Sequence, residues 1–107
     1  MSNRISASHI LIMHTDSQSS RSSLTKDQAL ELVNKLHKEI LDNPEKFRDI
    51  AVQKSDCASA SNAGSLGEFG KGMMVKEFEA AAFSLEVNQI SDPVETDFGF
   101  HIIKRDK

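Results

Sequence analysis

An apolar segment near the amino terminus constrains the fold more than any other part of the sequence. Between Ile5 and His14, apolar residues occupy both odd and even positions. Successive side chains of a strand point to opposite faces, so a strand with this pattern is buried on both sides. The segment therefore predicts a central strand in a sheet that other elements cover on both faces.

Two further segments and a proline carry helix signals. Thr25 and Gln28 have the spacing of a capping box, and apolar residues follow at helical spacing. Asn43 and Pro44 end this helix and begin a short second one, because proline restricts the residue before it and suits the first helical position. A third helix is expected over about 75–85, where apolar residues again share one side.

The remaining extended segments are short. We expect a strand at 66–69 within a glycine-rich stretch, and a hairpin made of residues 90–94 and 99–103. The order is then strand, helix, helix, strand, helix, strand, strand. This order favours an α+β fold with mixed or antiparallel pairing over a doubly wound parallel sheet.

The length of 107 residues predicts one domain over 1–107, with room for a single modest core. Residues 1–4 are expected to be a disordered terminus. The serine-rich stretch 15–23 has no apolar periodicity and is expected to be a mobile surface loop.

Charge and composition argue against two classes of partner. The chain has 16 acidic and 13 basic residues, interspersed, for a formal net charge of -3. A duplex-binding domain normally shows a basic stripe, so no nucleic-acid partner is expected. No apolar run approaches the roughly 20 residues of a membrane span. We expect a monomer in the cytoplasm, the nucleus or both, without a membrane partner.

The sequence also lacks the usual motifs for metals and cofactors. Cys57 is the single cysteine, so it forms neither an internal disulfide nor a paired-cysteine zinc site. His9 and His14 are an odd number of positions apart on a predicted strand and would point to opposite faces. The chain contains no Walker-type or GxGxxG phosphate loop. We therefore predict activity without metal or cofactor.

Five short phrases go beyond fold class. They are ASHILI (7–12), SDCAS (55–59), GSLGEFGKGM (64–73), FEAAAF (78–83) and TDFGFHIIKR (96–105). In this order and with these separations, the chain closely resembles the parvulin family of peptidyl-prolyl cis-trans isomerases. The Ser-Asp-Cys phrase is similar to the phosphorylation-directed Pin branch, whereas Phe98, at a position where that branch usually has serine, is similar to the bacterial branch.

The resemblance implies a four-stranded antiparallel sheet surrounded by helices, and isomerisation of X-Pro bonds in protein segments. It implies a site on one face, between the sheet and the loop that carries Cys57. The implied catalytic residues are His9, Cys57, Thr96 and His101. The implied substrate-binding residues are Leu66, Met74 and Phe78, as the proline pocket, together with Phe98 and Arg21. No bond breaks in this reaction, so the implied mechanism is non-covalent, with an apolar pocket beside a Cys/His polar cluster.

The residue types alone leave structural alternatives open. A single histidine in an apolar strand is more often a satisfied core residue than a catalyst, and a single cysteine often fills space as a small apolar side chain. Leu66, Met74 and Phe78 would be ordinary core residues under the same reasoning.

Substrate preference is the point at which the sequence departs from the Pin branch. That branch binds phosphate with a lysine and an arginine pair, whereas this chain has Met13 at the lysine position and Arg21 as the only cation of the following loop. We therefore expect a modest preference for an acidic or phosphorylated residue before proline. Two alternatives stay open: a phospho-Ser/Thr-Pro-directed isomerase, and a non-catalytic, chaperone-like peptide-binding domain.

Overall fold

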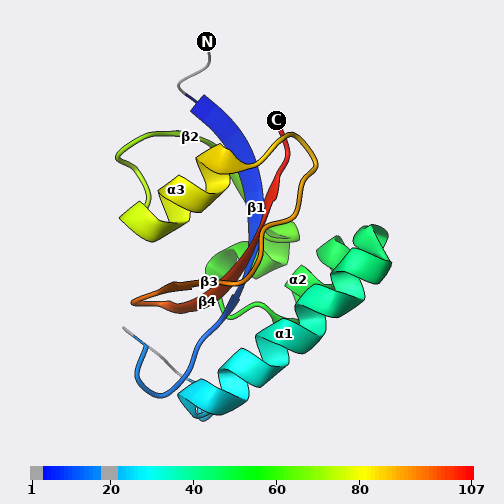
Figure 1. The fold of residues 1–107 in the computed structure, drawn as a ribbon, viewed down its shortest axis with the longest axis vertical. Helices are drawn as coiled ribbons and strands as arrows, with labels where there is room; N and C mark the ends of the chain where they lie inside the picture. The colour runs from blue at the N-terminus through cyan, green and yellow to red at the C-terminus, as the bar shows by residue number, and fades with distance from the viewer. Residues whose placement is uncertain (1–3, 18–21) are drawn as a thin grey trace.

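The computed structural model describes residues 4–17 and 22–107, and Figure 1 shows the arrangement of their elements. Residues 1–3 of the predicted disordered terminus, and residues 18–21 of the predicted mobile loop, lie outside the described residues. Arg4 was expected in that terminus, but it is the first residue of strand β1 (Arg4–Ile12) and pairs with Gly70.

The sheet has four antiparallel strands in the order β2-β1-β4-β3. Strand β1 pairs on one side with β2 (Ser65–Gly70) and on the other with β4 (Gly99–Arg105). The short strand β3 (Val94–Thr96) pairs with β4 at the far edge. The central position predicted for the first strand is therefore confirmed, as are the antiparallel sheet and the α+β class.

The two faces of β1 pack against different helices (Figure 1). One face, with Ile10 and Ile12, joins the main core under helices α1 (Lys26–Asp42) and α2 (Phe47–Lys54). The other face, with Ile5 and Ala7, packs with helix α3 (Lys76–Ser84) in a second cluster. This double cover explains why apolar residues occupy both parities of the strand.

The helix boundaries follow the predicted signals. At the start of α1, the Thr25 side chain accepts a hydrogen bond from the Gln28 amide at 3.1 Å, and the Gln28 side chain accepts from the Thr25 amide at 2.9 Å. Both halves of the capping box are thus present. Proline begins a single 3-10 turn, η1 (Pro44–Lys46), which leads directly into α2.

Two segments differ from the prediction. The loop after Cys57 contains an unpredicted 3-10 helix, η2 (Ala58–Asn62). Residues 90–94 were expected to form the first strand of the hairpin, but only Ile90 makes an isolated bridge, to Lys104, and β3 begins at Val94. Pro93 has no amide proton to donate. The Ser91 hydroxyl accepts from the Ile103 amide at 3.0 Å, so a side chain replaces a backbone partner there.

Two glycines of the β2 region give a matched test of backbone packing. Gly64 and Gly67 both have positive φ, +83° and +72°. A Cβ at Gly64 would lie 2.4 Å from the carbonyl oxygen of His9, whereas a Cβ at Gly67 would meet nothing within 4 Å. Gly64 is also hydrogen-bonded to β1, because the His9 amide donates to the Gly64 carbonyl at 2.9 Å.

We predict that Gly67→Ala lowers the free energy of unfolding by about 1–2 kcal/mol, because only the left-handed backbone is strained. Gly64→Ala should lower it by a further 1–3 kcal/mol or so, since the new methyl group also collides with backbone. Urea unfolding of both variants measures the difference. Equal losses in the two variants would show that the close approach at Gly64 does not constrain the fold.

Candidate active site

Two buried histidines meet on the face of the sheet that packs against α3. His9 lies on β1 and His101 on β4, in diagonally related positions of the ladder, since Leu11 is opposite His101 and His9 is opposite Ile103. Both side chains are buried, and their Nδ1 atoms are 3.0 Å apart. Because the two nitrogens share one hydrogen bond, one carries the proton and the other accepts it.

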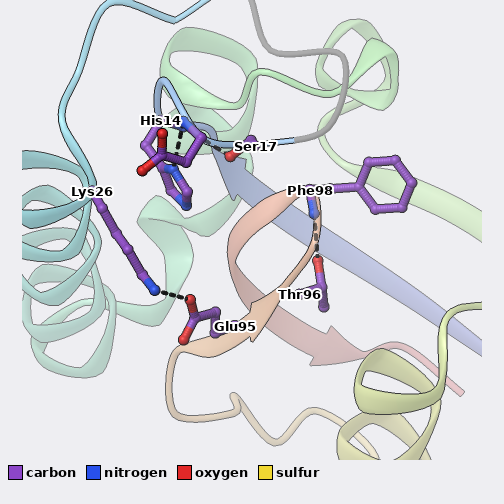
Figure 2. A network of polar contacts seen from close by, with 7 residues as sticks. His14, Ser17, Lys26, Glu95, Thr96 and Phe98 are labelled. Atoms are coloured by element: carbon purple, nitrogen blue, oxygen red, sulfur yellow. Dashed lines mark hydrogen bonds and ion pairs between the residues drawn. The ribbon is translucent and has the colours of Figure 1, made fainter.

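A short polar chain continues from this pair toward the β3–β4 turn. The other ring nitrogen of His101, Nε2, is 2.8 Å from the hydroxyl of Thr96. The same hydroxyl accepts a hydrogen bond from the amide of Phe98 at 3.1 Å, a contact drawn in Figure 2. Burial, together with the adjacent His9, lowers the pKa of His101 to about 3, so this imidazole is neutral near pH 7.

The partners of Thr96 indicate where the protons are. If Nε2 of His101 carried the proton, Thr96 would accept twice, and its own proton would have no acceptor among the described residues. With Nε2 unprotonated, Thr96 donates to His101, and Nδ1–H of His101 donates to Nδ1 of His9. This arrangement leaves the proton of His9 on Nε2 and satisfies every other member of the chain.

Cys57 lies next to this histidine pair. Hydrogen bonding to the His9 side chain, aided by Ser59 and opposed by partial burial, lowers the pKa of the Cys57 thiol to about 6. The thiolate therefore predominates at neutral pH. Nε2 of His9 is buried and lacks a partner at regular hydrogen-bond geometry among the described residues, so its interaction with the sulfur is a loose one.

The two residues before Cys57 fasten its loop to β1. The Ser55 hydroxyl accepts from the Leu11 amide at 3.0 Å, and the Asp56 carboxylate accepts from the Met13 amide at 2.8 Å. The Asp56 amide in turn donates to the Leu11 carbonyl at 2.7 Å. The sequence prediction used Ser55 and Asp56 only as part of a motif and missed their role in holding the loop. The available signal was that two hydrogen-bonding residues directly precede a candidate cysteine.

Phe78 joins the polar cluster to an apolar cavity. Its ring meets both imidazoles edge to face, with centroid distances of 5.4 Å to His9 and 5.3 Å to His101. The cavity beside it has a volume of about 700 Å³. Its lining is mostly apolar and consists of His9, Leu11, Met13, Asp56, Cys57, Ala58, Leu66, Met73, Met74, Val75, Phe78, Phe98 and His101.

The structure brings together eight of the nine site residues predicted from the sequence. Seven line the cavity, and Thr96 is hydrogen-bonded to one of them. Arg21 lies outside the described residues. The sequence prediction missed Leu11 and Met13, although both share the parity of His9 and therefore its face of the strand. Met73, which is 61% exposed, also lines the cavity beside Met74.

The described residues contain no group of three or more His, Cys, Asp or Glu side chains placed to hold a metal ion. Within the same ranges, 4–17 and 22–107, no helix is long and apolar enough to cross a membrane.

Comparison with known proteins identifies the family. The model of the PPIC-type PPIase domain matches residues 9–107. The chain is a member of the parvulin family. Peptidyl-prolyl cis-trans isomerase Pin1 from Digitalis lanata is 45% identical to this parvulin, and the match covers 97% of both chains. The foldase PrsA of Staphylococcus epidermidis is also 45% identical over 94% of this chain, but the match spans 31% of its own length.

A solved structure agrees with the sequence relatives. The peptidyl-prolyl isomerase ESS1 of Candida albicans superposes with a TM-score of 0.94 at 35% identity, over 98% of this parvulin and 63% of that chain. The parvulin fold and the class of activity are therefore those expected from the sequence: this chain is a peptidyl-prolyl cis-trans isomerase that acts on proline-containing segments.

The lowered pKa of Cys57 gives a direct test of the site's electrostatics. Alkylation of Cys57 by iodoacetamide should rise with pH around a midpoint near 6, instead of the value near 9 of an ordinary thiol. In His9→Gln the midpoint should move upward, because the imidazole contact is the largest cause of the lowered pKa. His37→Gln, which changes a histidine outside the cavity, should leave the midpoint unchanged. A midpoint above pH 8 in the wild-type chain would contradict the conclusion that the Cys57 thiolate predominates at neutral pH.

Proposed function

We propose that isomerisation takes place in the cavity beside Phe78, by a non-covalent mechanism in which an apolar pocket and a polar cluster act on the two ends of one X-Pro unit. The observation that supports this proposal is the position of Phe78, which borders the apolar cavity on one side and contacts both imidazoles on the other. A proline ring held against Leu66, Met74 and Phe78 would have its imide bond next to the histidine pair and Cys57.

The reaction requires only a lower rotational barrier. Amide resonance resists rotation by ~18–20 kcal/mol, and about 100 turnovers per second needs a reduction of roughly 5–6 kcal/mol. Resonance places negative charge on the imide oxygen in the planar state, and this charge decreases as the bond twists. An apolar cavity removes the water that stabilises that charge, so it raises the planar state relative to the twisted one.

The polar cluster would add to this effect. The Cys57 thiolate, whose pKa is near 6, is an anion at the cavity wall, and an anion near the imide oxygen further disfavours its charge-separated form. The neutral His101 and the fixed donor order from Thr96 to His9 hold the side chains in one orientation without a proton transfer. In this proposal His9, Thr96 and His101 set the orientation and charge of the site, and no covalent bond to Cys57 forms.

A Cys57 nucleophile is the alternative that the same geometry permits, since a thiolate lies beside an imidazole. The two mechanisms differ in their response to Cys57→Ser. A hydroxyl keeps a polar group at the wall and should retain part of the activity under the non-covalent mechanism. Complete loss of activity in a folded Cys57→Ser chain would support the nucleophile.

The apolar pocket gives the main prediction. Phe78→Ala and Met74→Ala should each lower kcat/KM on X-Pro peptides by about one to three decades, since each removes roughly 1.5–4 kcal/mol of contact with the ring. Exchange spectroscopy by NMR measures the rates. Val87→Ala, which shortens an apolar side chain that is 53% exposed and lies outside the cavity, is the matched control. Variants that remain folded with unchanged rates would show that proline binds elsewhere.

We also propose that an acidic or phosphorylated residue before proline is preferred only modestly. The support is the composition of the cavity wall: among the described residues, neither lysine nor arginine lines it, and Met13 lies at the position where the Pin branch has lysine. An exposed ion pair contributes about 0–1 kcal/mol, which corresponds to less than about tenfold selectivity.

The measurement compares kcat/KM for matched peptides with Ser, Glu or phosphoserine before proline, at low and physiological salt. We expect similar rates for Glu and phosphoserine and a small salt effect. A phosphoserine preference above about a hundredfold that disappears in Arg21→Ala would overturn this expectation and favour the phospho-directed alternative.

Two broader proposals complete the functional assignment. We propose a monomer, since the site residues of the parvulin come from one chain, and sedimentation velocity tests this directly. We also propose action in a reducing compartment, the cytoplasm or the nucleus, because a thiolate with a pKa near 6 is easily oxidised. Imaging of the tagged protein tests the second proposal.

A further inference from the structure

A second cavity lies on the other side of the β3–β4 turn from the active cavity, and Figure 2 shows its polar contacts. Its volume is about 390 Å³. It is formed where the segment after β1 meets the start of α1 and the β3–β4 turn. Its lining is His14, Asp16, Lys26, Glu95, Thr96 and Asp97.

His14 lines this cavity and has an unsatisfied ring nitrogen. The amide of Asp16 donates to Nδ1 of His14 at 3.2 Å, so Nδ1 is an acceptor and the proton of the neutral ring is on Nε2. The side chain is 5% exposed, and Nε2 is buried without a hydrogen-bond partner among the described residues. A buried N–H without an acceptor is unfavourable, so this atom favours a ligand that carries an oxygen acceptor.

The charges of the cavity favour a cation. Lys26 and Glu95 form an ion pair at 2.6 Å and offset each other. Asp16 and Asp97 are exposed, and neither lies within ion-pair distance of a cation in the described part of the chain. Three carboxylates against one ammonium group disfavour an anionic ligand. The cavity therefore suits a ligand with a cationic group and a carbonyl oxygen, which is the chemistry of a lysine or arginine residue within a peptide.

Residues that are adjacent in sequence line the two cavities. Met13 lines the active cavity and the next residue, His14, lines the second one. The same alternation occurs at the turn, where Phe98 lines the active cavity and Asp97 lines the second. An extended peptide covers about 3.3–3.6 Å per residue, so a few residues are enough to reach from one cavity to the other.

We propose that this second cavity binds a lysine or arginine of the same protein segment whose X-Pro bond occupies the active cavity. The cationic group lies by Asp16 and Asp97, and a backbone carbonyl of the segment accepts from Nε2–H of His14. This inference rests on the proposed function, because it takes the active cavity as the place where proline binds. It assigns a specificity determinant on the opposite side of the turn from the proline pocket.

The test is a lysine scan. In a series of ten-residue peptides with one Ala-Pro unit, lysine is placed singly at each of three positions before alanine and four after proline, with norleucine as the neutral reference. We expect one position, or two adjacent ones, to raise kcat/KM about three- to tenfold, mainly through a lower KM, with less effect at high salt. A flat scan would overturn the inference.

Charge-matched variants separate a specific site from general attraction. Asp97→Asn should remove most of the lysine preference and leave the norleucine peptide unaffected. Asp42→Asn removes the same charge from an exposed position at the end of α1 and should leave the preference intact. If both variants lose the preference equally, or neither does, the cavity is not the lysine site.

A binding measurement keeps this inference distinct from the proposed function. ¹⁵N NMR of the His14 ring during titration with the preferred lysine peptide should shift Nε2–H, and His14→Phe should weaken binding of that peptide. Retained turnover without an Asp97-dependent lysine preference overturns only the present inference. Asp97-dependent binding of the lysine peptide, in a chain whose Phe78→Ala variant keeps full activity, overturns the assignment of the proline pocket and the shared-segment geometry built on it, and leaves the second cavity as a lysine site.

Discussion

Strand β1 is apolar on both faces and must be covered on both. The helices on its two faces cover it to different extents. The face with Ile10 and Ile12 is sealed under α1 and α2 and supplies the large, continuous core. The other face is only partly filled by α3, so that Ile5 and Ala7 are packed while His9 borders an open cavity. A fully covered face anchors the sheet, and the incompletely covered face provides the site.

The hydrogen bond between His9 and His101 depends on this arrangement. Two imidazoles with nitrogens 3.0 Å apart are compatible only when one of those nitrogens has no proton, and in the assigned tautomers this is Nδ1 of His9. Burial keeps His101 neutral, so that its Nε2 accepts from Thr96 while its Nδ1–H donates to His9. The ladder between β1 and β4 fixes the distance, and Thr96 fixes the tautomer from the outer end. The ionisation of the Cys57 thiol depends on the same pair, because the hydrogen bond to His9 is the largest cause of its lowered pKa.

Local sequence signals predicted most of the fold. The parity of the first strand, the capping box at Thr25 and the proline at position 44 each specify a conformation within a few residues, and the structure has all three. The segment 90–93 was misassigned because its pairing with β4 is only half backbone: the Ser91 amide donates to the Ile103 carbonyl, but the Ile103 amide donates to the Ser91 hydroxyl, and no periodicity reports such a substitution. The turn η2 was missed for a similar reason, since small polar residues fit several loop conformations.

The candidate site was predicted largely from motif resemblance. The residue types alone could not distinguish a catalytic histidine from a histidine that only fills the core. The distance between His9 and His101, and the edge-to-face contacts of Phe78 with both rings, depend on strand register and helix placement. The second cavity could not have been predicted, because it combines a residue after β1, a residue at the start of α1 and a turn distant in sequence. Only tertiary structure places these together.

The hydrogen bonds of Ser55 and Asp56 mean that the walls of the active cavity belong to two different parts of the structure. The polar wall belongs to the sheet, because His9 lies on β1 and three hydrogen bonds hold the Cys57 loop to Leu11 and Met13. The apolar wall, with Met74 and Phe78, belongs to α3 and the loop before it. The hydrogen bonds that hold the Cys57 loop therefore involve no residue of the loop before α3, and a change at Met74 leaves them in place. Substitutions in the loop before α3 would then alter which segments are accepted, whereas Phe78 ties the helix itself to the two imidazoles, so that recognition can diverge in the loop while the helix stays constrained by catalysis.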